Sequence, residues 1–339
     1  MTKRCIATRK GGELTVIDVS PPTPKAGEVS IRNKAVALNP VDWKKLEYGI
    51  MTDSWPAVFG SDVAGVVESV GEGVSAFKPG DEVFSLAGHD NRAGGFQEIS
   101  TVPEHFVAHK PPSWTFEEAA SVPICYLTAA AAVTLGLKVT LPFLQENART
   151  SQESLRSVLV IGGGSGVGAS AIQLLRIAAP SLEIVVTASP SHHAPLISLG
   201  ATTCVDRATP DIVGAIKAAS ADGLGVDAIL DAVLGAGTEN QPCLFDTLRA
   251  DGPKLYSAVV TDTQLSIPAG VEAVKSSGRQ TFGVAGGMSA MSVLAKLGRD
   301  GDFKPPLKIE VVGKGLESIG DGLEKLKSGV SRTKLIVTL

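Results

Sequence analysis

The stretch that decides the fold class is Val158-Leu159-Val160-Ile161, followed at once by Gly162-Gly163-Gly164-Ser165-Gly166-Val167-Gly168. The four apolar residues predict a buried strand, and the mostly apolar residues 169–178 predict a helix that ends before Pro180. A glycine loop between a strand and a helix lets backbone N–H groups approach a pyrophosphate, whose charge the helix N-terminus stabilises. The pattern departs from G-x-G-x-x-G because Ser165 stands at the middle glycine position. We therefore expect a dinucleotide site at this loop, with contacts from Gly163, Gly164, Ser165, Gly166 and Val167.

Strand-like and helix-like segments alternate after this loop. Residues 182–187, 203–205 and 226–230 are short apolar runs, and residues 194–199 and 212–219 between them have helical character. Alternation of this kind is typical of parallel βαβ units. The sequence therefore predicts an α/β protein with a doubly wound parallel sheet, the Rossmann arrangement.

The N-terminal part has a different pattern. Residues 28–38 place apolar side chains at nearly every second position, and residues 62–70 are a second strand candidate. Turn-forming residues at 71–73 and 78–81 separate such runs. Short strands with frequent turns predict a small β-rich barrel, to which the last strand, 335–339, is expected to return.

Composition limits the classes of protein and partner. The 339 residues suffice for about two domains at ~100–200 residues each, and 44% hydrophobic with 19% charged residues favour a packed core. A net charge of -4 without a basic run argues against nucleic acid. We expect no signal peptide and no membrane span. The four cysteines form no CxxC pair, which favours a cytoplasmic protein with reduced thiols.

The end of the second Rossmann strand carries information on the cofactor. NAD-specific sites place a carboxylate there, about 20 residues after the loop, to bind the ribose 2′-OH. Residues 186–193 contain no carboxylate. Ser189, Ser191, His192 and the later Arg207 could instead bind a 2′-phosphate, so NADPH is favoured over NADH. Alternatively, the two serines only cap the following helix.

Three N-terminal motifs carry a resemblance to a known family. They are Asn39-Pro40-Val41-Asp42-Trp43, Gly60-Ser61-Asp62-Val63-Ala64-Gly65-Val66-Val67 and Phe77-Lys78-Pro79-Gly80-Asp81-Glu82-Val83. Their order and spacing resemble the GroES-like domain of medium-chain dehydrogenases/reductases. The resemblance covers nearly the whole chain, and implies a GroES-like substrate domain over 1–125 and 290–339 and a Rossmann domain over 126–289.

Within this superfamily, the chain looks most similar to the quinone and enoyl reductase branch. The tail over 312–318 is similar to fungal members that include trans-acting enoyl reductases of polyketide pathways. Zinc-dependent members carry a cysteine near the position of Asn39 and a histidine at that of Ser61, and neither is present. The resemblance therefore implies no metal. Without a metal to polarise an alcohol oxygen, hydride transfer to an activated acceptor is the natural reaction.

The resemblance also implies roles for individual residues. Tyr48 would stabilise or protonate an enolate, Lys44 would lie near the nicotinamide ribose, and Thr128 would face the nicotinamide. Asn39 would line the same cleft, and Lys334 would reach the pyrophosphate. For each of the five, a purely structural role is the alternative.

Three functions follow from these observations. The first is NADPH-dependent reduction of an enone or enoyl thioester, free or tethered to a carrier protein, in fungal secondary metabolism. The second is quinone reduction or another redox step on the same fold, and the third is nucleotide binding with little catalysis. We expect a monomer or a homodimer, with residues 280–284 as the sheet edge and residues 141–157 as a polar, solvent-exposed insertion.

Overall fold

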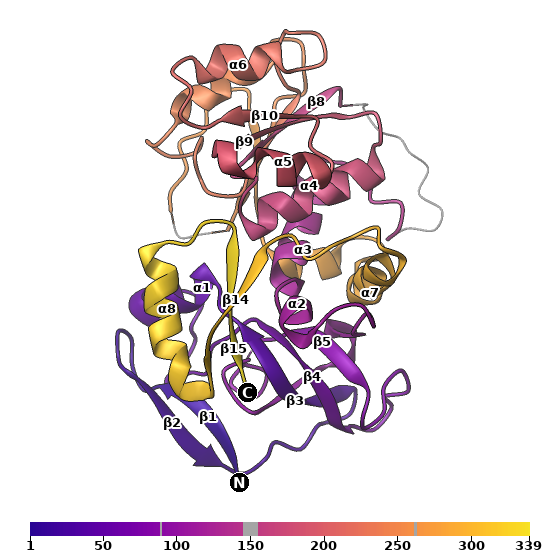
Figure 1. Ribbon diagram of the computed structural model, residues 1–339, viewed down its shortest axis with the longest axis vertical. Coiled ribbons are helices and arrows are strands. Elements are labelled where there is room, and N and C mark those ends of the chain that lie inside the picture. Colours follow the sequence, from indigo (N-terminus) through magenta and orange to yellow (C-terminus); the bar gives the residue numbers. More distant parts are fainter. Residues whose placement is uncertain (89, 145–154, 261–262) are drawn as a thin grey trace. The chain divides into compact units, whose positions relative to one another are not determined.

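The computed structural model describes residues 1–88, 90–144, 155–260 and 263–339, and the chain divides into two compact units (Figure 1). Unit 1 comprises Met1–Ile124 and Met291–Leu339, and unit 2 comprises Cys125–Ala290. Each boundary lies one residue from the predicted one. Most of the expected insertion over 141–157 lies outside the described residues, because 145–154 are not among them.

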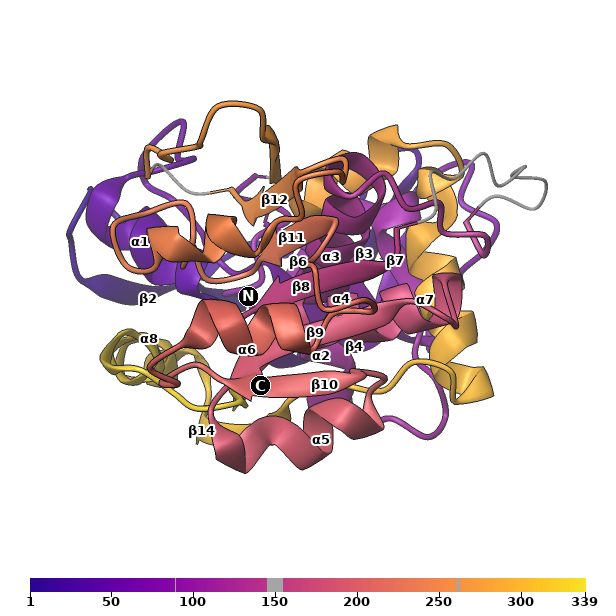
Figure 2. The ribbon, with the colours of Figure 1, turned by 90° about the horizontal axis from the view of Figure 1, so that it is seen from above.

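Unit 2 is built on a six-stranded parallel sheet with the order β10-β9-β8-β11-β12-β13. Figure 2 shows β8 to β12 with the helices α4 and α6 beside them. The strands are β8 (Ser157–Ile161), β9 (Glu183–Ala188), β10 (Thr203–Asp206), β11 (Ala228–Asp231), β12 (Leu255–Val259) and β13 (Glu272–Ser276). The helices between them are α4 (Gly166–Ala178), α5 (His193–Ser198) and α6 (Ile212–Ala218). This order is that of a doubly wound sheet, with its switch point at β8 and β11, so the prediction is confirmed.

Local sequence explains why β8 lies at the centre. All five of its residues are buried, and neighbours on both sides, β9 and β11, pair with it. A strand buried on both faces needs a continuous apolar run rather than an alternating one. Helix α4 begins where the Ser165 hydroxyl accepts a hydrogen bond from the Gly168 N–H at 3.0 Å, a typical N-cap.

Unit 1 is β-rich, as predicted. Its seven-stranded sheet has the order β14-β15-β3-β4-β5-β7, with β6 also paired to β3. The strands are β3 (Glu28–Ala37), β4 (Asp62–Val70), β5 (Glu82–Leu86), β6 (Ile99–Pro103), β7 (Val107–His109), β14 (Lys308–Lys314) and β15 (Thr333–Thr338), and β1 (Thr2–Ala7) and β2 (Leu14–Val19) form a separate hairpin. The C-terminal strand β15 lies antiparallel to β3, which confirms its expected return to this unit.

Unit 1 also contains the helices α1 (Pro40–Tyr48), α2 (Phe116–Ala120) and α8 (Ile319–Ser328). Helix α7 (Ala290–Asp300) begins at the last residue of unit 2 and otherwise belongs to unit 1. One apolar cluster fills the unit, and its fully buried members include Ile31, Val63 and Phe96. The side chains of α8 join the same cluster through Ile319 and Leu323.

The prediction of an edge strand over 280–284 is wrong. Residues Gly278–Gly283 form a short 3₁₀ helix, and the sheet ends at β13 instead. The Thr281 hydroxyl points inward and donates to the Leu127 carbonyl at 2.6 Å. Gly287 packs so closely on the Thr281 backbone that a Cβ there would lie 1.8 Å from its carbonyl oxygen. This tightly packed, glycine-rich segment forms turns. It therefore has no extended backbone that could pair with a neighbouring β-strand.

Among the described residues, one helical stretch, 116–136, is long and apolar enough to cross a membrane by length and composition alone. It comprises α2, α3 (Pro123–Ala131) and a π-helical turn over Ala132–Gly136. Its apolar window is 83% buried inside the protein, as in the core helix of a globular domain.

Candidate functional site

The glycine loop has the shape that a dinucleotide requires. Gly162 adopts φ +74°, and a Cβ at Gly163 would lie 2.1 Å from Cγ1 of Val186. A Cβ at Gly168 would lie 2.4 Å from the Gly162 carbonyl oxygen. The N–H groups of Gly166 and Val167, in the first turn of the 13-residue helix α4, have no acceptor within the helix. The loop therefore offers free donors at a positive helix end and fits a pyrophosphate.

The ends of β9 and β10 form the adjoining part of the site. The Arg207 N–H donates to the Ala188 carbonyl at 3.2 Å, so Arg207 follows β10 directly beside the start of the Ser189 segment. Ser189 makes no side-chain capping bond to the short helix after it, which removes the evidence for a purely capping role. His192 lies near Gly164, since a Cβ on that glycine would be 3.0 Å from the imidazole Nδ1. The structure thus brings the Ser189 segment, the His192 imidazole and the backbone of Arg207 to one edge of the sheet.

Asp206 is the nearby carboxylate, at the end of β10. It pairs in register with Ala188, and its Oδ1 accepts from the Ala208 N–H at 3.0 Å. The corresponding end of β9 carries no acidic residue, as the sequence showed.

Thr128 belongs to α3 in unit 2 and is 7% exposed. The Leu127 carbonyl beside it accepts from Thr281. This contact holds the backbone of α3 against residues 278–283. It lies next to Thr128, which was predicted to face the nicotinamide.

In unit 1, Lys334 and Asn39 lie together in a buried polar cluster. Lys334 is 4% exposed, and its Nζ lies 2.6 Å from Asn39 Oδ1 and 3.2 Å from Asp62 Oδ2. The Asn39 amide also donates to Asp62 at 2.9 Å, and the other Asp62 oxygen accepts from the Ile124 N–H at 2.7 Å. The ammonium expected to reach a pyrophosphate is therefore paired with a carboxylate of its own unit.

Asp42 is a second buried carboxylate near this cluster. It accepts from the Asn39 N–H at 2.8 Å and the Gly60 N–H at 3.2 Å, which fixes the start of α1. Burial raises its pKa to about 6, although the nearby Lys45 acts in the opposite direction. Burial raises the pKa of Asp62 too, against the opposing effect of Lys334. Sequence reasoning missed both aspartates as members of the cluster, and the only signal was the capping pattern of Asn39 and Asp42 three residues apart.

Tyr48 and Lys44 lie on α1, and both contact Trp43. The Tyr48 ring is 51% exposed and meets the Trp43 ring edge-on, with centroids 5.9 Å apart. Lys44 Nζ lies 5.6 Å from the Trp43 centroid. Lys327 of α8 lies 5.8 Å from the same centroid and pairs with Glu47 at 2.7 Å. Trp43 therefore orients both predicted residues, and the exposed phenol is available to a ligand.

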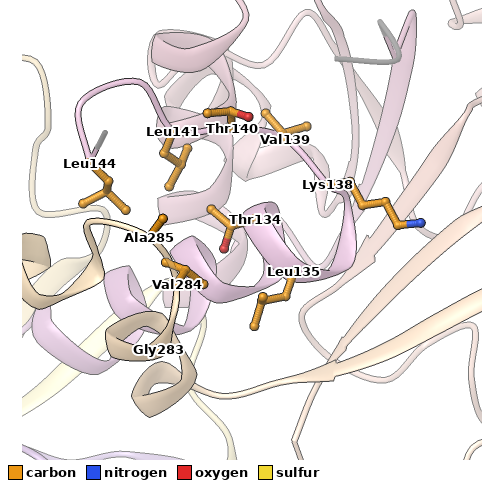
Figure 3. Close-up of a pocket in the computed structure, with 10 residues that line it drawn as sticks. All are labelled: Thr134, Leu135, Lys138, Val139, Thr140, Leu141, Leu144, Gly283, Val284 and Ala285. Carbon is orange, nitrogen blue, oxygen red and sulfur yellow. The ribbon is translucent and has the colours of Figure 1, made fainter. Parts of the chain in front are cut away.

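Each unit contains a cavity lined by described residues. One in unit 2, of about 300 Å³, is lined by residues that include Thr134, Leu141 and Val284, and no predicted site residue lines it (Figure 3). The other, in unit 1, has about 460 Å³ and is lined by residues of α1 and α8, among them Trp43.

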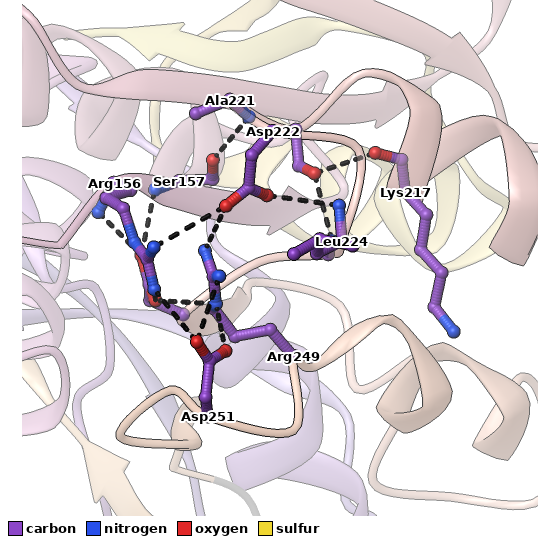
Figure 4. A network of polar contacts seen from close by, with 11 residues as sticks. Arg156, Ser157, Lys217, Ala221, Asp222, Leu224, Arg249 and Asp251 are labelled. Atoms are coloured by element: carbon purple, nitrogen blue, oxygen red, sulfur yellow. Dashed lines mark hydrogen bonds and ion pairs between the residues drawn. The ribbon is translucent and has the colours of Figure 1, made fainter.

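A charged cluster at the amino ends of the unit 2 strands is structural (Figure 4). Arg249, 2% exposed, lies 2.6 Å from Asp251 and 2.9 Å from Asp222. Arg249 holds the pKa of Asp251 below its usual range. Ligands of doubly wound sheets bind at the carboxyl ends, so this cluster stabilises the opposite edge.

Comparison with known proteins agrees with this geometry. Residues 25–112 match the alcohol dehydrogenase GroES-like domain. A dehydrogenase of Aspergillus niger is 30% identical over 357 residues, covering 98% of both chains. The chain belongs to the medium-chain dehydrogenase/reductase superfamily. A trans-enoyl reductase of Gibberella fujikuroi is 32% identical over 253 residues, 73% of this chain and 68% of that protein. The structure of the CurK enoyl reductase is similar, with a TM-score of 0.78 at 24% identity, covering 99% of both chains.

Membership establishes several properties. The two predicted domain types, the Rossmann and the GroES-like domain, are confirmed, and the chain is an oxidoreductase that uses a nicotinamide dinucleotide. In the parts of the chain that the structure describes, no three His, Cys, Asp or Glu side chains gather as a possible metal site.

The buried Asp42 carboxyl predicts a specific pH dependence. Its folded-state pKa of about 6 exceeds the ordinary value of 3.8, so the folded protein holds the proton between these values while the unfolded chain releases it. The free energy of unfolding therefore falls as the pH rises from 4 to 6, by about 3 kcal/mol from this group. Asp42→Asn should remove this slope. Urea unfolding of both proteins between pH 4 and 7 measures it, and parallel curves would contradict the prediction.

Proposed function

We propose that the protein is a zinc-independent, NADPH-dependent reductase of activated C=C bonds, acting on an enone or an enoyl thioester. The observation that carries this proposal is the side-chain set where zinc-dependent members bind their metal. Ser61 stands at the histidine position, Asn39 stands near the first cysteine position, and the neighbouring Asp62 is paired with Lys334. These groups offer no set of three or four zinc ligands. Fungal relatives named trans-enoyl reductases support the choice of substrate class.

The cofactor preference rests on charge at the end of β9. Ser189, Ser191, His192 and Arg207 would bind a 2′-phosphate, and a carboxylate suited to a free 2′-OH is missing from that strand end. The glycine loop would hold the pyrophosphate. When bound, the nicotinamide supplies the hydride that reduces the substrate.

The residues of unit 1 would act on the substrate. The Tyr48 phenol would donate a hydrogen bond to the oxygen that becomes negative when the β-carbon accepts hydride. Lys44 would bind the ribose, and Thr128 of unit 2 would face the nicotinamide. Asn39 would orient the ammonium of Lys334 through their hydrogen bond.

We infer a setting in the cytoplasm and in fungal secondary metabolism, with a polyketide chain presented by a carrier protein as one form of the substrate. The names of the relatives support the chemistry of this inference. The four cysteines are free thiols, as in a reducing compartment.

Zinc independence gives a direct test. Exhaustive chelation should leave reductase activity within about twofold of the untreated enzyme, because no metal polarises the substrate. Elemental analysis of the purified protein should show no stoichiometric zinc. One zinc per chain, with activity lost on its removal, would refute the proposal.

NADPH should bind at least ~10-fold more tightly than NADH, a difference of ~1.4 kcal/mol. Ser189→Asp should reduce this ratio, because a carboxylate repels a 2′-phosphate and accepts a hydrogen bond from a free 2′-OH. Titration calorimetry with both cofactors measures the ratio. Leu224→Ala, at the amino-end side of β11, serves as the control that keeps the wild-type ratio. Equal wild-type affinities would overturn the assignment.

Tyr48→Phe should lower kcat by ~10²–10⁴-fold, the range for losing one acid–base or oxyanion partner. The affinity for NADPH should stay nearly constant, because the phenol would contact the substrate. Steady-state kinetics with an enone and an enoyl thioester measure the first effect, and calorimetry measures the second. An unchanged kcat would remove Tyr48 from the mechanism and leave solvent as the proton source.

A further inference from the structure

The loop after β11 is organised by one buried carboxylate. Asp231, the last residue of the strand, accepts hydrogen bonds on Oδ1 from the N–H groups of Val233 at 3.2 Å and Gly235 at 2.9 Å. Oδ2 accepts from the Ala236 N–H at 2.8 Å and from the Tyr256 hydroxyl at 2.9 Å. Four donors on one fully buried carboxylate fix the conformation of this loop.

Tyr256 is the member of this group from a neighbouring strand, β12. Its ring is fully buried against Phe245, with centroids 4.9 Å apart. A Cβ at Gly237 would lie 2.5 Å from its hydroxyl oxygen, so glycine at that position lets the loop close over the phenol. Burial, followed by the charge of Asp231, raises the pKa of Tyr256, which therefore remains a donor.

The loop presents an apolar side chain to the glycine loop. Val233 is 51% exposed, and a Cβ at Gly162 would lie 2.5 Å from its Cγ1. The Ala232 N–H donates to the Ile161 carbonyl at 3.1 Å, which anchors the loop beside the end of β8. The next residue, Leu234, has φ +59°, a conformation that costs a non-glycine residue energy. The Asp231 hydrogen bonds hold this strained backbone in place.

The position of the loop in the sheet points to its ligand. In a doubly wound sheet, the two halves bind the two mononucleotides on either side of the first strand's glycine loop. The half with β9 and β10 holds the Ser189 and Arg207 group, so it receives the adenosine side. The loop after β11 belongs to the other half.

We propose that Asp231 and Tyr256 are positioning residues that hold Val233 as an apolar contact for the nicotinamide nucleotide half of the cofactor. This inference rests on the proposed function only in requiring that a nicotinamide dinucleotide binds at the glycine loop. It does not depend on the substrate or on Tyr48.

The test compares two ligands that differ by the nicotinamide nucleotide. Binding of NADPH and of 2′,5′-ADP to the full chain is measured by calorimetry for the wild type and for Asp231→Asn, Tyr256→Phe and Val233→Ala. In Asp231→Asn, the amide NH₂ group faces the Ala236 N–H, so this N–H loses its hydrogen-bond acceptor. The loop should then no longer be held in its present conformation. Kd for NADPH should rise roughly 10-fold or more in this variant and severalfold in the other two, while Kd for 2′,5′-ADP stays within twofold.

Leu224→Ala is the matched control, because Leu224 is also an exposed apolar residue, 62% exposed, in the loop that precedes β11. It should change neither affinity. Val233→Ala keeps the test valid if Asp231→Asn fails to fold, since an exposed side chain contributes little to the core.

Two outcomes would overturn the inference: unchanged NADPH affinity in all three loop variants, or an equal loss for both ligands in Val233→Ala. Failure of the proposed function looks different. A wild-type protein that binds 2′,5′-ADP no better than 5′-AMP contradicts the NADPH preference alone, and a Tyr48→Phe variant with normal kcat contradicts the proton donor alone.

Discussion

The pairing of Asp62 with Lys334 is the constraint on which unit 1 depends. Asp62 is the first residue of β4, and Lys334 lies in β15, 272 residues later in the chain. Isolated, either charge would cost several kcal/mol in the interior, so each requires the other. Asn39 bridges the pair, and the Ile124 N–H uses the remaining carboxylate oxygen. The cluster thereby joins the C-terminal strand, the start of α1 and the segment that leads to unit 2.

This arrangement also bears on the chemistry available there. A carboxylate that accepts from an amide, a backbone N–H and an ammonium has few lone pairs left for a metal ion. The neighbouring Ser61 contributes a hydroxyl, a weak zinc ligand compared with histidine or cysteine. On α1, the Tyr48 phenol is exposed and contacts Trp43.

How much of this could be predicted depends on the range of each interaction. The β8 strand and the glycine loop are local features, because an apolar run, several glycines and a capping serine determine them within 11 residues. The two-unit division and the return of β15 were also foreseeable, from the change in pattern along the chain. The conformation of residues 280–284 could not be foreseen, because it depends on a hydrogen bond from Thr281 to Leu127, 154 residues away. The clusters around Asp62 and Asp231 are long-range in the same sense. Their aspartates have no local signature beyond their places at strand ends.

A common device links the buried aspartates of both units. Asp42 fixes the N–H groups that begin α1, Asp62 accepts from Ile124, and Asp231 accepts three N–H groups of its loop. Asp227 does the same at the amino edge of the sheet, where it accepts from the N–H groups of Arg156 and Ser157. Each carboxylate stabilises a strand end or helix start whose donors lack partners in regular secondary structure. Each of these four carboxylates thus accepts at least one backbone N–H group and fixes the chain conformation beside it.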